Sequence, residues 1–505
     1  MATITTAPGT QDSLVGDSGA AHDSSVRRWW VLAVLGTAQL TITLTATVMN
    51  IALPYAQRDL GFSDASRQWV VIGYTLAFGS LLLLGGRLSD LFGRRSMVIA
   101  GLAGFAIASA VGGAAVNLDM LIGARVAQGV FAAVLSPAIL STLSVTFTEP
   151  SERAKAFGIF GAITGGGAAT GLLLGGALTE WASWRWALYI NLVFAGVALV
   201  GASLLLARHA AHPKPVLDLP GTVTVTAALF SIVYGFSHAE TNGWSNTVTI
   251  GFLIVGVALL CAFVIVETRV TDPLLPPRIV LDRIRSGAYL AVFTIGIGLW
   301  VVFLFLTYYM QLIRGYSPLL TGVAFLPMVA ALVLSSLTTP SVLLPRLGTR
   351  LTVAGGLLVA AAGMAALTRI GLDTGYGHLL PGEILLGLGV GAAISVAMQS
   401  ATAGVDHADA GVASAMTNAS QQIGGSIGTA LLSTFAATAM THYLVGKAPS
   451  PVLESQAQIH SYITSFWWAA GFLAAGAIIL AVLMRTGSQD QPHDGRVHHA
   501  RRRLC

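Results

Sequence analysis

Apolar and polar residues alternate in long blocks along this chain. Fourteen apolar runs, most of them about 17–25 residues long, are separated by short polar segments. A run of this length spans the hydrocarbon core of a bilayer as an α-helix, because a helix satisfies every backbone hydrogen bond within itself. The runs cover residues 30–53, 68–85, 97–116, 119–145, 156–179, 186–207, 219–237, 247–266, 287–312, 321–344, 351–370, 379–403, 412–440 and 463–484. The pattern predicts an all-α polytopic membrane protein with fourteen transmembrane helices.

Lysine and arginine residues fall mainly on alternate polar segments. With the N-terminus inside, about 20 of the 27 basic residues occupy inner segments and about 6 occupy outer ones. Cytoplasmic loops carry such an excess, and an even number of spans returns the chain to its starting side. We therefore expect a multi-pass plasma-membrane protein with both termini in the cytoplasm. The polar N-terminus, 1–27, is expected to be disordered, and 486–505 to form a basic tail.

The composition agrees with this pattern. Of 505 residues, 54% are hydrophobic and 10% are charged, whereas soluble proteins carry about 25% charged residues. The formal net charge is +5, but the basic residues are dispersed between apolar spans, so we expect no nucleic-acid partner. The two cysteines, Cys261 and Cys505, indicate neither a disulfide framework nor a metal site.

A charged segment at 267–285 divides the chain after eight spans and leaves six. The natural division is an N-terminal six-helix bundle (28–207), two extra helices with a central cytoplasmic loop (208–286), and a C-terminal six-helix bundle (287–485). The stretch at 345–350, PRLGTR, is a partial echo of the stretch GRLSDLFGRR at 86–95. Internally repeated transporters show echoes of this kind.

The stretch at 86–95 is expected to be a tight water-facing link between two spans. Gly86 and Gly93 permit close backbone approach and a sharp turn. Asp90 is able to pair with Arg94 or Arg95. One reading is an ordinary basic cytoplasmic loop, and the other is a conformational latch that a charge pair opens or closes.

The first span carries a polar stripe. Gln39, Thr43, Thr47 and Asn50 lie on one side of a helix, and Pro54 is expected to end it. Lipid offers these groups no partner, so the stripe is predicted to face the bundle interior. It either packs helix against helix or lines a path for a substrate or ion.

Arg125 lies about one turn inside the fourth span, with Gln128 one turn further on. An ionised group at depth costs about 2.5–3.5 kcal/mol on insertion scales, which marks a functional residue unless the side chain reaches the interface. The thirteenth span places Asn418 and Gln421 on one face, opposite the first span if the halves surround a cavity. The fifth span carries glycines spaced by four, which serve close packing or a gating hinge.

No nucleophile–base constellation, catalytic carboxylate pair or phosphate loop stands out, so we expect neither an enzyme nor a cofactor. The glycines at 165–167 lie inside a span, which disfavours a nucleotide cradle. A channel is disfavoured by the glycine-rich packing.

These motifs resemble the fourteen-helix drug:proton antiporters of the major facilitator superfamily, over nearly all of residues 28–485. The stretch at 86–95 is similar to the family's first motif. LIGARVAQG at 121–129 is similar to its fourth-helix motif, in which the arginine is linked to proton coupling. The glycine-rich fifth span is similar to its antiporter motif. The resemblance implies alternating access, in which two halves rock around a central site.

Two positions depart from the family pattern. Thr45 stands where the first span of the family usually has an aspartate, and Leu172 stands where the antiporter motif often has proline. None of the 22 acidic residues lies near the centre of a predicted span, and Glu383 is near the outer start of the twelfth. A path without a central carboxylate disfavours a lipophilic cation, so we expect a neutral or anionic amphipathic substrate.

The resulting hypothesis is proton-driven efflux of a hydrophobic neutral or anionic drug across the plasma membrane. A facilitator or proton symporter for a metabolite is the alternative. We expect a monomer whose partners are a small-molecule substrate, protons and the lipid bilayer. The candidate substrate-binding residues are Gln39, Thr43, Thr45, Asn50, Arg125, Gln128, Asn418 and Gln421. The candidate proton-coupling residues are Arg125, Asp90 and Glu383, and the gating residues are Gly86, Asp90, Gly93, Arg94 and Arg95.

Overall fold

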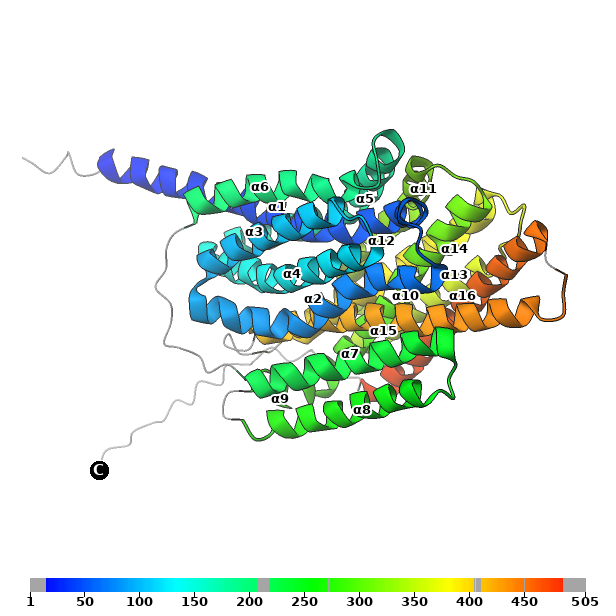
Figure 1. Cartoon of the computed structure of the whole chain (residues 1–505). Coiled ribbons are helices and arrows are strands. Elements are labelled where there is room, and N and C mark those ends of the chain that lie inside the picture. Colours follow the sequence, from blue (N-terminus) through cyan, green and yellow to red (C-terminus); the bar gives the residue numbers. More distant parts are fainter. Residues whose placement is uncertain are drawn as a thin grey trace, which may run out of the picture.

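The computed structural model describes residues 15–206, 218–270, 273–275, 277–403, 405, 410–448 and 450–484. All regular structure in these residues is helical (Figure 1). The elements are α1 (Val15–Leu60), α2 (Asp64–Phe92), α3 (Arg94–Gly113), α4 (Leu118–Thr146), α5 (Pro150–Trp181), α6 (Trp186–Leu205), α7 (Leu219–Asn242), α8 (Thr247–Glu267), α9 (Pro277–Val280), α10 (Arg283–Tyr308), the π-helical turn η1 (Tyr309–Ile313), α11 (Pro318–Ala324), α12 (Leu326–Val342), α13 (Leu344–Leu367), α14 (Tyr376–Thr402), α15 (Ala410–Leu444) and α16 (Pro451–Leu483).

Fourteen helical segments of the described chain are long and apolar enough to cross a membrane, which confirms the predicted count. α10 and η1 form one span, α11 and α12 form another, and the short α9 forms none. Several helices start at side-chain caps. The side chains of Asn117, Asp218, Asp282 and Ser450 accept hydrogen bonds from backbone N–H groups of the first turn, which would otherwise lack a partner.

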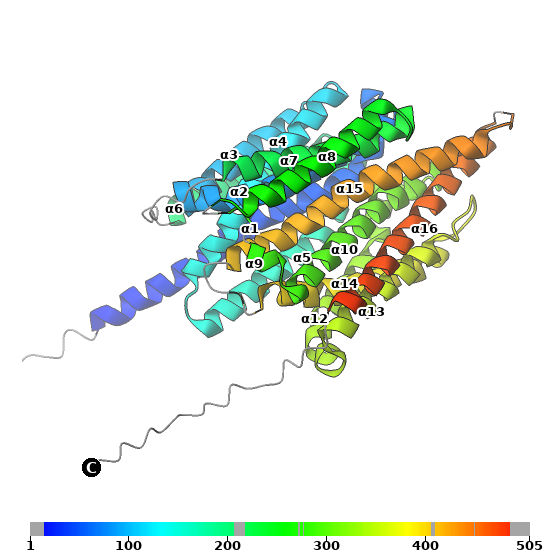
Figure 2. The same ribbon diagram turned by 90° about the horizontal axis from the view of Figure 1, so that it is seen from below.

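The helices form two halves of six spans each, and an extra helical pair lies on one side, alongside the line where the halves meet (Figures 1 and 2). α1–α6 pack together, and the spans from α10 to α16 form the second half. The halves meet along α2 and α15, where Ser426 donates a hydrogen bond to Thr75 at 2.7 Å. α7 and α8 pack on each other, and α7 lies against both α2 and α15. The major facilitator architecture with two additional helices is therefore confirmed.

The two halves share one backbone device. Gly93 has φ 86° and is the single residue between α2 and α3. Gly348, in the echo stretch, has φ 72° and interrupts the helical path at the start of α13. Glycine tolerates positive φ because it has no Cβ. The expected turn is thus found at Gly93, and it recurs in the second half.

Two expected boundaries are wrong. α2 continues to Phe92, so Gly86 and the residues up to Phe92 are helical and the link is one residue long. α1 passes through Pro54 and ends at Leu60. A proline kinks or interrupts a helix only locally, and the remaining bonds of a buried helix carry it onward. α1 begins at Val15, and 1–14 and 485–505 lie outside the described residues, so the expected disorder of the N-terminus and the expected basic tail stay predictions.

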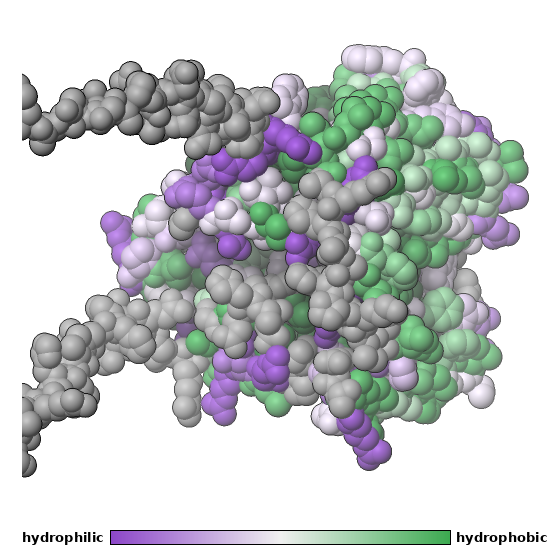
Figure 3. Space-filling model, turned by 90° about the vertical axis from the view of Figure 1, so that its left-hand side faces the viewer, coloured by the Kyte–Doolittle hydropathy of each residue, from purple (hydrophilic) through white to green (hydrophobic). Residues whose placement is uncertain are grey.

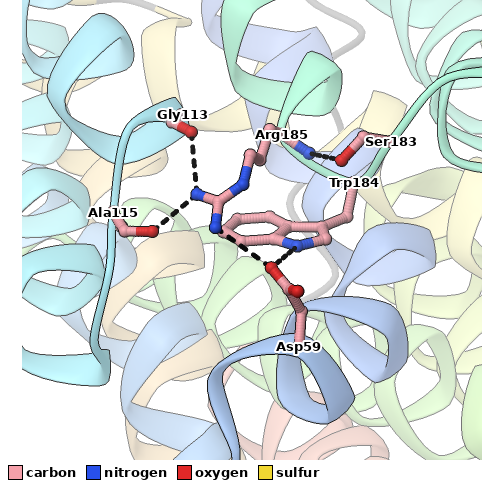
Figure 4. A network of polar contacts seen from close by, with 6 residues as sticks. All are labelled: Asp59, Gly113, Ala115, Ser183, Trp184 and Arg185. Atoms are coloured by element: carbon pink, nitrogen blue, oxygen red, sulfur yellow. Dashed lines mark hydrogen bonds and ion pairs between the residues drawn. The ribbon is translucent and has the colours of Figure 1, made fainter.

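The end of the first half farthest from Gly93 is tied by a polar network (Figure 4). One oxygen of Asp59 on α1 accepts hydrogen bonds from Trp184 Nε1 at 2.9 Å and from Arg185 at 3.0 Å. Arg185 also donates to the carbonyl groups of Gly113 and Ala115. Because each partner comes from a different part of the bundle, the network joins α1, the end of α3 and the start of α6.

Candidate functional site

A cavity of about 710 Å³ lies between the two halves. It occupies the end of the molecule that carries Gly93, since it is formed by the last turns of α2, α4 and α14 and the first turns of α5 and α15. Its lining includes Leu82, Leu83, Gly86, Arg87, Ser89, Ser136, Pro137, Leu140, Ser141, Ser144, Thr148, Arg153, Phe157, Leu274, Thr402, Val412, Ser414, Ala415 and Asn418. Figure 3 looks at this end, and hydrophilic side chains gather on it.

The described lining of this cavity is apolar with hydroxyl groups and two cations. Arg87 and Arg153 supply positive charge, and no aspartate or glutamate is among the lining residues named above. A cationic ligand would lose its hydration here without gaining an opposite charge. A neutral or anionic amphipathic molecule would find apolar walls, hydroxyl donors and guanidinium groups.

The other end of the interface between the halves is closed. α5 packs on α11 so tightly that a Cβ on Gly176 would lie 2.7 Å from the carbonyl oxygen of Pro318. Glu180, at the end of α5, accepts a hydrogen bond from the backbone N–H of Leu319 at 3.0 Å. Gln311 Nε2 donates to the carbonyl oxygen of Ile51 at 3.1 Å. Since each contact joins one half to the other, the cavity communicates with one end only.

The polar stripe of α1 points into the protein, and its residues differ in what they contact. Gly167 packs against Thr43 and Gly171 against Thr47, so these threonines face α5 and serve helix packing. Asn50 is about 2% exposed, and its Nδ2 donates to the carbonyl oxygen of Ala46. Gln39 is partly buried, and its backbone carbonyl accepts the hydroxyl of Thr43.

Asn50 Oδ1 and Thr45 Oγ1 are buried without a hydrogen-bond partner among the described residues. Buried polar atoms normally find a partner. Asn50 in the stripe and Thr45 on another side of α1 therefore keep unused hydrogen-bonding capacity, and neither residue lines the cavity.

Arg125 is fully enclosed in the first half. Its Nε donates to the carbonyl oxygen of Val70 at 3.0 Å, and its NH1 donates to Gln128 Oε1 at 3.0 Å. Gln128 in turn donates to Ser109 at 2.8 Å, and the Arg125 guanidinium lies 4.5 Å from the centre of the Tyr74 ring. The side chain does not reach an interface, and in this conformation neither Arg125 nor Gln128 lines the cavity. Arg125 on α4 is therefore bonded directly to α2 and, through Gln128, linked to α3.

Glu383 on α14 is completely buried near the closed end. Its Oε2 accepts a hydrogen bond from the Tyr376 hydroxyl at 3.1 Å, and the same hydroxyl lies 2.7 Å from the carbonyl oxygen of Ala324. Glu383 Oε1 has no partner among the described residues. A single hydroxyl hydrogen serves one acceptor at a time, so Glu383, Tyr376 and α11 form a small network with room for one more proton.

On α15, Asn418 lines the cavity, whereas Gln421 is partly buried deeper along the helix. Gly424 packs on the backbone of Phe293 and Gly425 on the ring of Trp300, so these glycines let α15 approach α10 closely. Of the predicted substrate-binding residues, Asn418 is the one that the cavity lining includes.

The predicted latch residues are only partly described. Arg95 donates to the carbonyl oxygen of Ser203 at 2.7 Å, which ties it to the end of α6. Arg94 is partly buried at the start of α3. The side chain of Asp90 lies outside the described part of the structure, so its expected pairing stays a prediction.

Sequence reasoning missed the residues that shape the cavity mouth. Arg87 belongs to the stretch at 86–95 but was not singled out, and it donates to the carbonyl oxygen of Pro273 at 2.8 Å. Arg153 follows the Glu149 cap of α5. Gly85 fits against Ala133 with no room for a side chain. Both arginines lie beside the ends of predicted spans. That these ends meet around one cavity becomes visible only in the three-dimensional packing.

Comparison with known proteins places this geometry in context. The model of the Major Facilitator Superfamily matches residues 35–429. The chain is 48% identical over 492 residues to the puromycin resistance protein pur8 of Streptomyces alboniger, covering 96% of this chain and 98% of that protein. It is 35% identical over 473 residues to the cephamycin export protein CmcT of Amycolatopsis lactamdurans, covering 92% and 94%.

Solved structures share the fold at low identity. A peptide transporter of the POT family in an auto-inhibited state matches with a TM-score of 0.67 and 15% identity, covering 92% of this chain and 98% of that chain. A bacterial homologue of the human lysosomal transporter Spinster, inward-facing and unoccupied, matches with a TM-score of 0.64 and 15% identity, covering 90% and 97%. With a family model over most of its length, full-length relatives and fourteen spans, the chain belongs to the Major Facilitator Superfamily, as a membrane transporter of the drug-efflux type.

Proposed function

We propose that this transporter exports a neutral or anionic amphipathic drug from the cytoplasm in exchange for protons. The observation that carries the proposal is the cavity between the halves, which opens at one end, holds two arginines and has no carboxylate among its named lining residues. The names of the relatives support a drug as the cargo, because they are resistance and export proteins for antibiotics.

Alternating access follows from the same geometry. We assign the halves to 28–207 and 287–485. They contact each other through α5 and α11 and are separated at the cavity. The positive-inside bias supports our assignment of the cavity end and both chain termini to the cytoplasmic side of the plasma membrane. We assign this conformation as inward-open and the transporting unit as a monomer. Asp90, with Arg94 and Arg95, is assigned to stabilising the outward-open state.

Glu383 is our candidate for the proton carrier. The family aspartate position holds Thr45, which cannot ionise at physiological pH. Glu383 is a buried carboxyl whose one hydrogen-bond donor among the described residues is the Tyr376 hydroxyl, and its second oxygen has no partner there. Burial without a counter-charge favours the neutral acid, and movement of α11 away from Tyr376 would expose the group for proton release. Arg125 is assigned to coupling through α2 and α4 rather than to contact with the drug in this state.

The test uses purified protein in liposomes with an imposed pH gradient. An antiporter drives substrate toward the acidic compartment whatever its orientation, whereas a proton symporter drives it away from that compartment. Accumulation on the acidic side that an uncoupler abolishes supports antiport. Accumulation on the alkaline side would establish the metabolite-symporter alternative, and equilibration without accumulation would establish a facilitator.

Substrate charge is tested with one fluorescent scaffold that carries a carboxylate, an amide or a quaternary ammonium group. We expect the first two compounds to be moved and the third to be excluded. Transport of the quaternary compound alone would refute the charge argument. In Glu383→Gln, drug exchange without a gradient should persist while gradient-driven accumulation is lost, and an unchanged accumulation would remove Glu383 from the mechanism. Resistance of expressing cells to puromycin is the first whole-cell phenotype to measure.

A further inference from the structure

Two buried carboxyl groups meet where the extra helical pair reaches the cavity end. Asp218 precedes α7 and Glu267 is the last residue of α8, and each is about 4% exposed. Asp218 Oδ1 accepts the backbone N–H of Gly221 at 2.8 Å. Glu267 Oε2 accepts the backbone N–H of Leu275 at 2.9 Å. One oxygen of each carboxyl is therefore already satisfied.

The other two oxygens face each other. Asp218 Oδ2 and Glu267 Oε1 are buried and have no hydrogen-bond donor among the described residues. A Cβ added to Gly221 would collide with both atoms, so they flank the same point, and the two carboxyls lie within hydrogen-bonding reach of each other. Two ionised carboxylates in this position would repel, whereas a proton between them forms a short charge-assisted hydrogen bond.

The surrounding charge also calls for one proton. Among the described side chains, Arg87 of α2 is the basic group that acts electrostatically on Glu267, and Asp218, which precedes α7, is the acidic group. Two carboxylates beside one guanidinium leave a net charge of about −1 in a buried site, and one shared proton makes the cluster neutral. Burial favours the neutral arrangement because an uncompensated charge loses its hydration.

We propose that Asp218 and Glu267 form a proton-binding site that holds one proton between them and thereby fixes a wall of the cavity. The wall residue is Leu274, which lines the cavity and is about 1% exposed. Its neighbours are both held by the cluster: Arg87 binds the carbonyl oxygen of Pro273 and Glu267 binds the N–H of Leu275. Loss of the proton separates the carboxyls, pulls the ends of α7 and α8 apart and releases segment 273–275.

This site is distinct from the proposed carrier Glu383. It lies at the cavity end and outside the two six-helix halves, whereas Glu383 lies near the closed end within the second half. Its failure and the failure of proton-coupled export are therefore separable in experiment.

The direct test is pH-difference infrared spectroscopy of the full chain in lipid nanodiscs. Wild type should lose a carboxylic-acid C=O band on alkalinisation, and that band should be missing from both Asp218→Asn and Glu267→Gln. The proton is shared by the two carboxyls, so removing either one removes the pair that binds it, and each single variant should lose the whole band. The matched control Glu454→Gln changes an exposed acid of α16 and should leave the band intact.

Two results would overturn the proposal in this experiment. A band that survives in one of the single variants means that the carboxyls titrate independently. A band that appears in wild type only after treatment with a chelator means that a divalent cation, and not a proton, occupies the pair.

A second measurement follows the wall itself. The native thiols are first removed by Cys261→Ser and Cys505→Ser. In this background we compare a probe, Leu274→Cys, with a reference, Ser414→Cys, by their labelling rates with a water-soluble maleimide. The ratio of the two rates cancels the pH dependence of thiol reactivity. The ratio should rise several-fold with pH and become pH-independent in Asp218→Asn, because an asparagine donates to Glu267 at every pH. A ratio that stays constant in the wild-type pair would show that the proton does not hold the segment.

Discussion

Replacing Gly176 by alanine should shift the transporter away from the cavity-open conformation. A Cβ at this position would lie 2.7 Å from both the Cα of Leu319 and the carbonyl oxygen of Pro318. Backbone atoms cannot turn away as a flexible side chain does, so α5 and α11 must separate. Their separation is the movement that opens the closed end, and the strain is therefore specific to this conformation.

The size of the shift follows from the overlap. Overpacking a well-packed contact costs typically about 1–3 kcal/mol. If this strain is absent when α5 and α11 part, the equilibrium constant between the conformations changes by about 5- to 150-fold. Alanine also favours a helix over glycine by about 1 kcal/mol, but that gain is common to both conformations. Gly166→Ala on the same helix shares the gain and meets nothing within 4 Å, so it is the matched control.

Spin-label distances across both ends of the molecule measure the equilibrium. The pair Val116 and Val445 reports the closed end, and the pair Phe92 and Leu347 reports the cavity end; all four side chains are exposed. With Gly176→Ala, the first distance should lengthen and the second should shorten in a larger fraction of molecules. Identical distributions for Gly176→Ala and its control would refute the assignment of α5–α11 as the gate.

Three other substitutions test the packing and the electrostatics. Arg125→Ala should abolish transport and destabilise the inserted protein by about 1–3 kcal/mol, measured by thermal unfolding in detergent, because it strands buried hydrogen-bond acceptors; wild-type efflux would remove Arg125 from the mechanism. Gly85→Val should abolish the folded protein in size-exclusion chromatography, since a side chain there collides with the carbonyl of Ala133; a folded variant would contradict the contact. The hydrogen bond from Ser151 holds the pKa of exposed Glu149 below its usual value. The α5 cap is therefore intact above the ordinary carboxyl pKa and is lost as pH falls through the pKa of the folded state. Ser151→Ala should raise the Glu149 pKa measured by carboxyl NMR, and an unchanged pKa would refute the cause.

The number and type of elements were predictable because hydropathy acts locally. Each span can be recognised from its own composition without knowledge of the packing, and the structure confirms the count of fourteen. Helix ends were less predictable. Pro54 and the stretch after Gly86 both read as breaks, yet neighbouring helices support α1 and α2 beyond them. Tertiary packing overrides local propensity there.

The site was predictable in part. The polar stripe of α1 points inward as expected, but its Thr43 and Thr47 pack against α5, and its Asn50 keeps an unpartnered oxygen. Asn418 reaches the cavity lining, and Arg125 does not. The Asp218–Glu267 pair could not be foreseen, because the two residues flank different helices and meet only when α7 and α8 fold into a hairpin.

The links at Gly93 and Gly348 restrict where the chain can flex. With so few residues between consecutive spans, α2 and α3, or α12 and α13, cannot slide past each other and are obliged to travel as pairs. The longest connections between spans instead flank the α7–α8 hairpin, at 206–218 and 268–282. The polypeptide should therefore tolerate being severed in either of these two stretches, with the fragments assembling into an active transporter when co-expressed, whereas a break at Gly93 would leave helices unable to find their register.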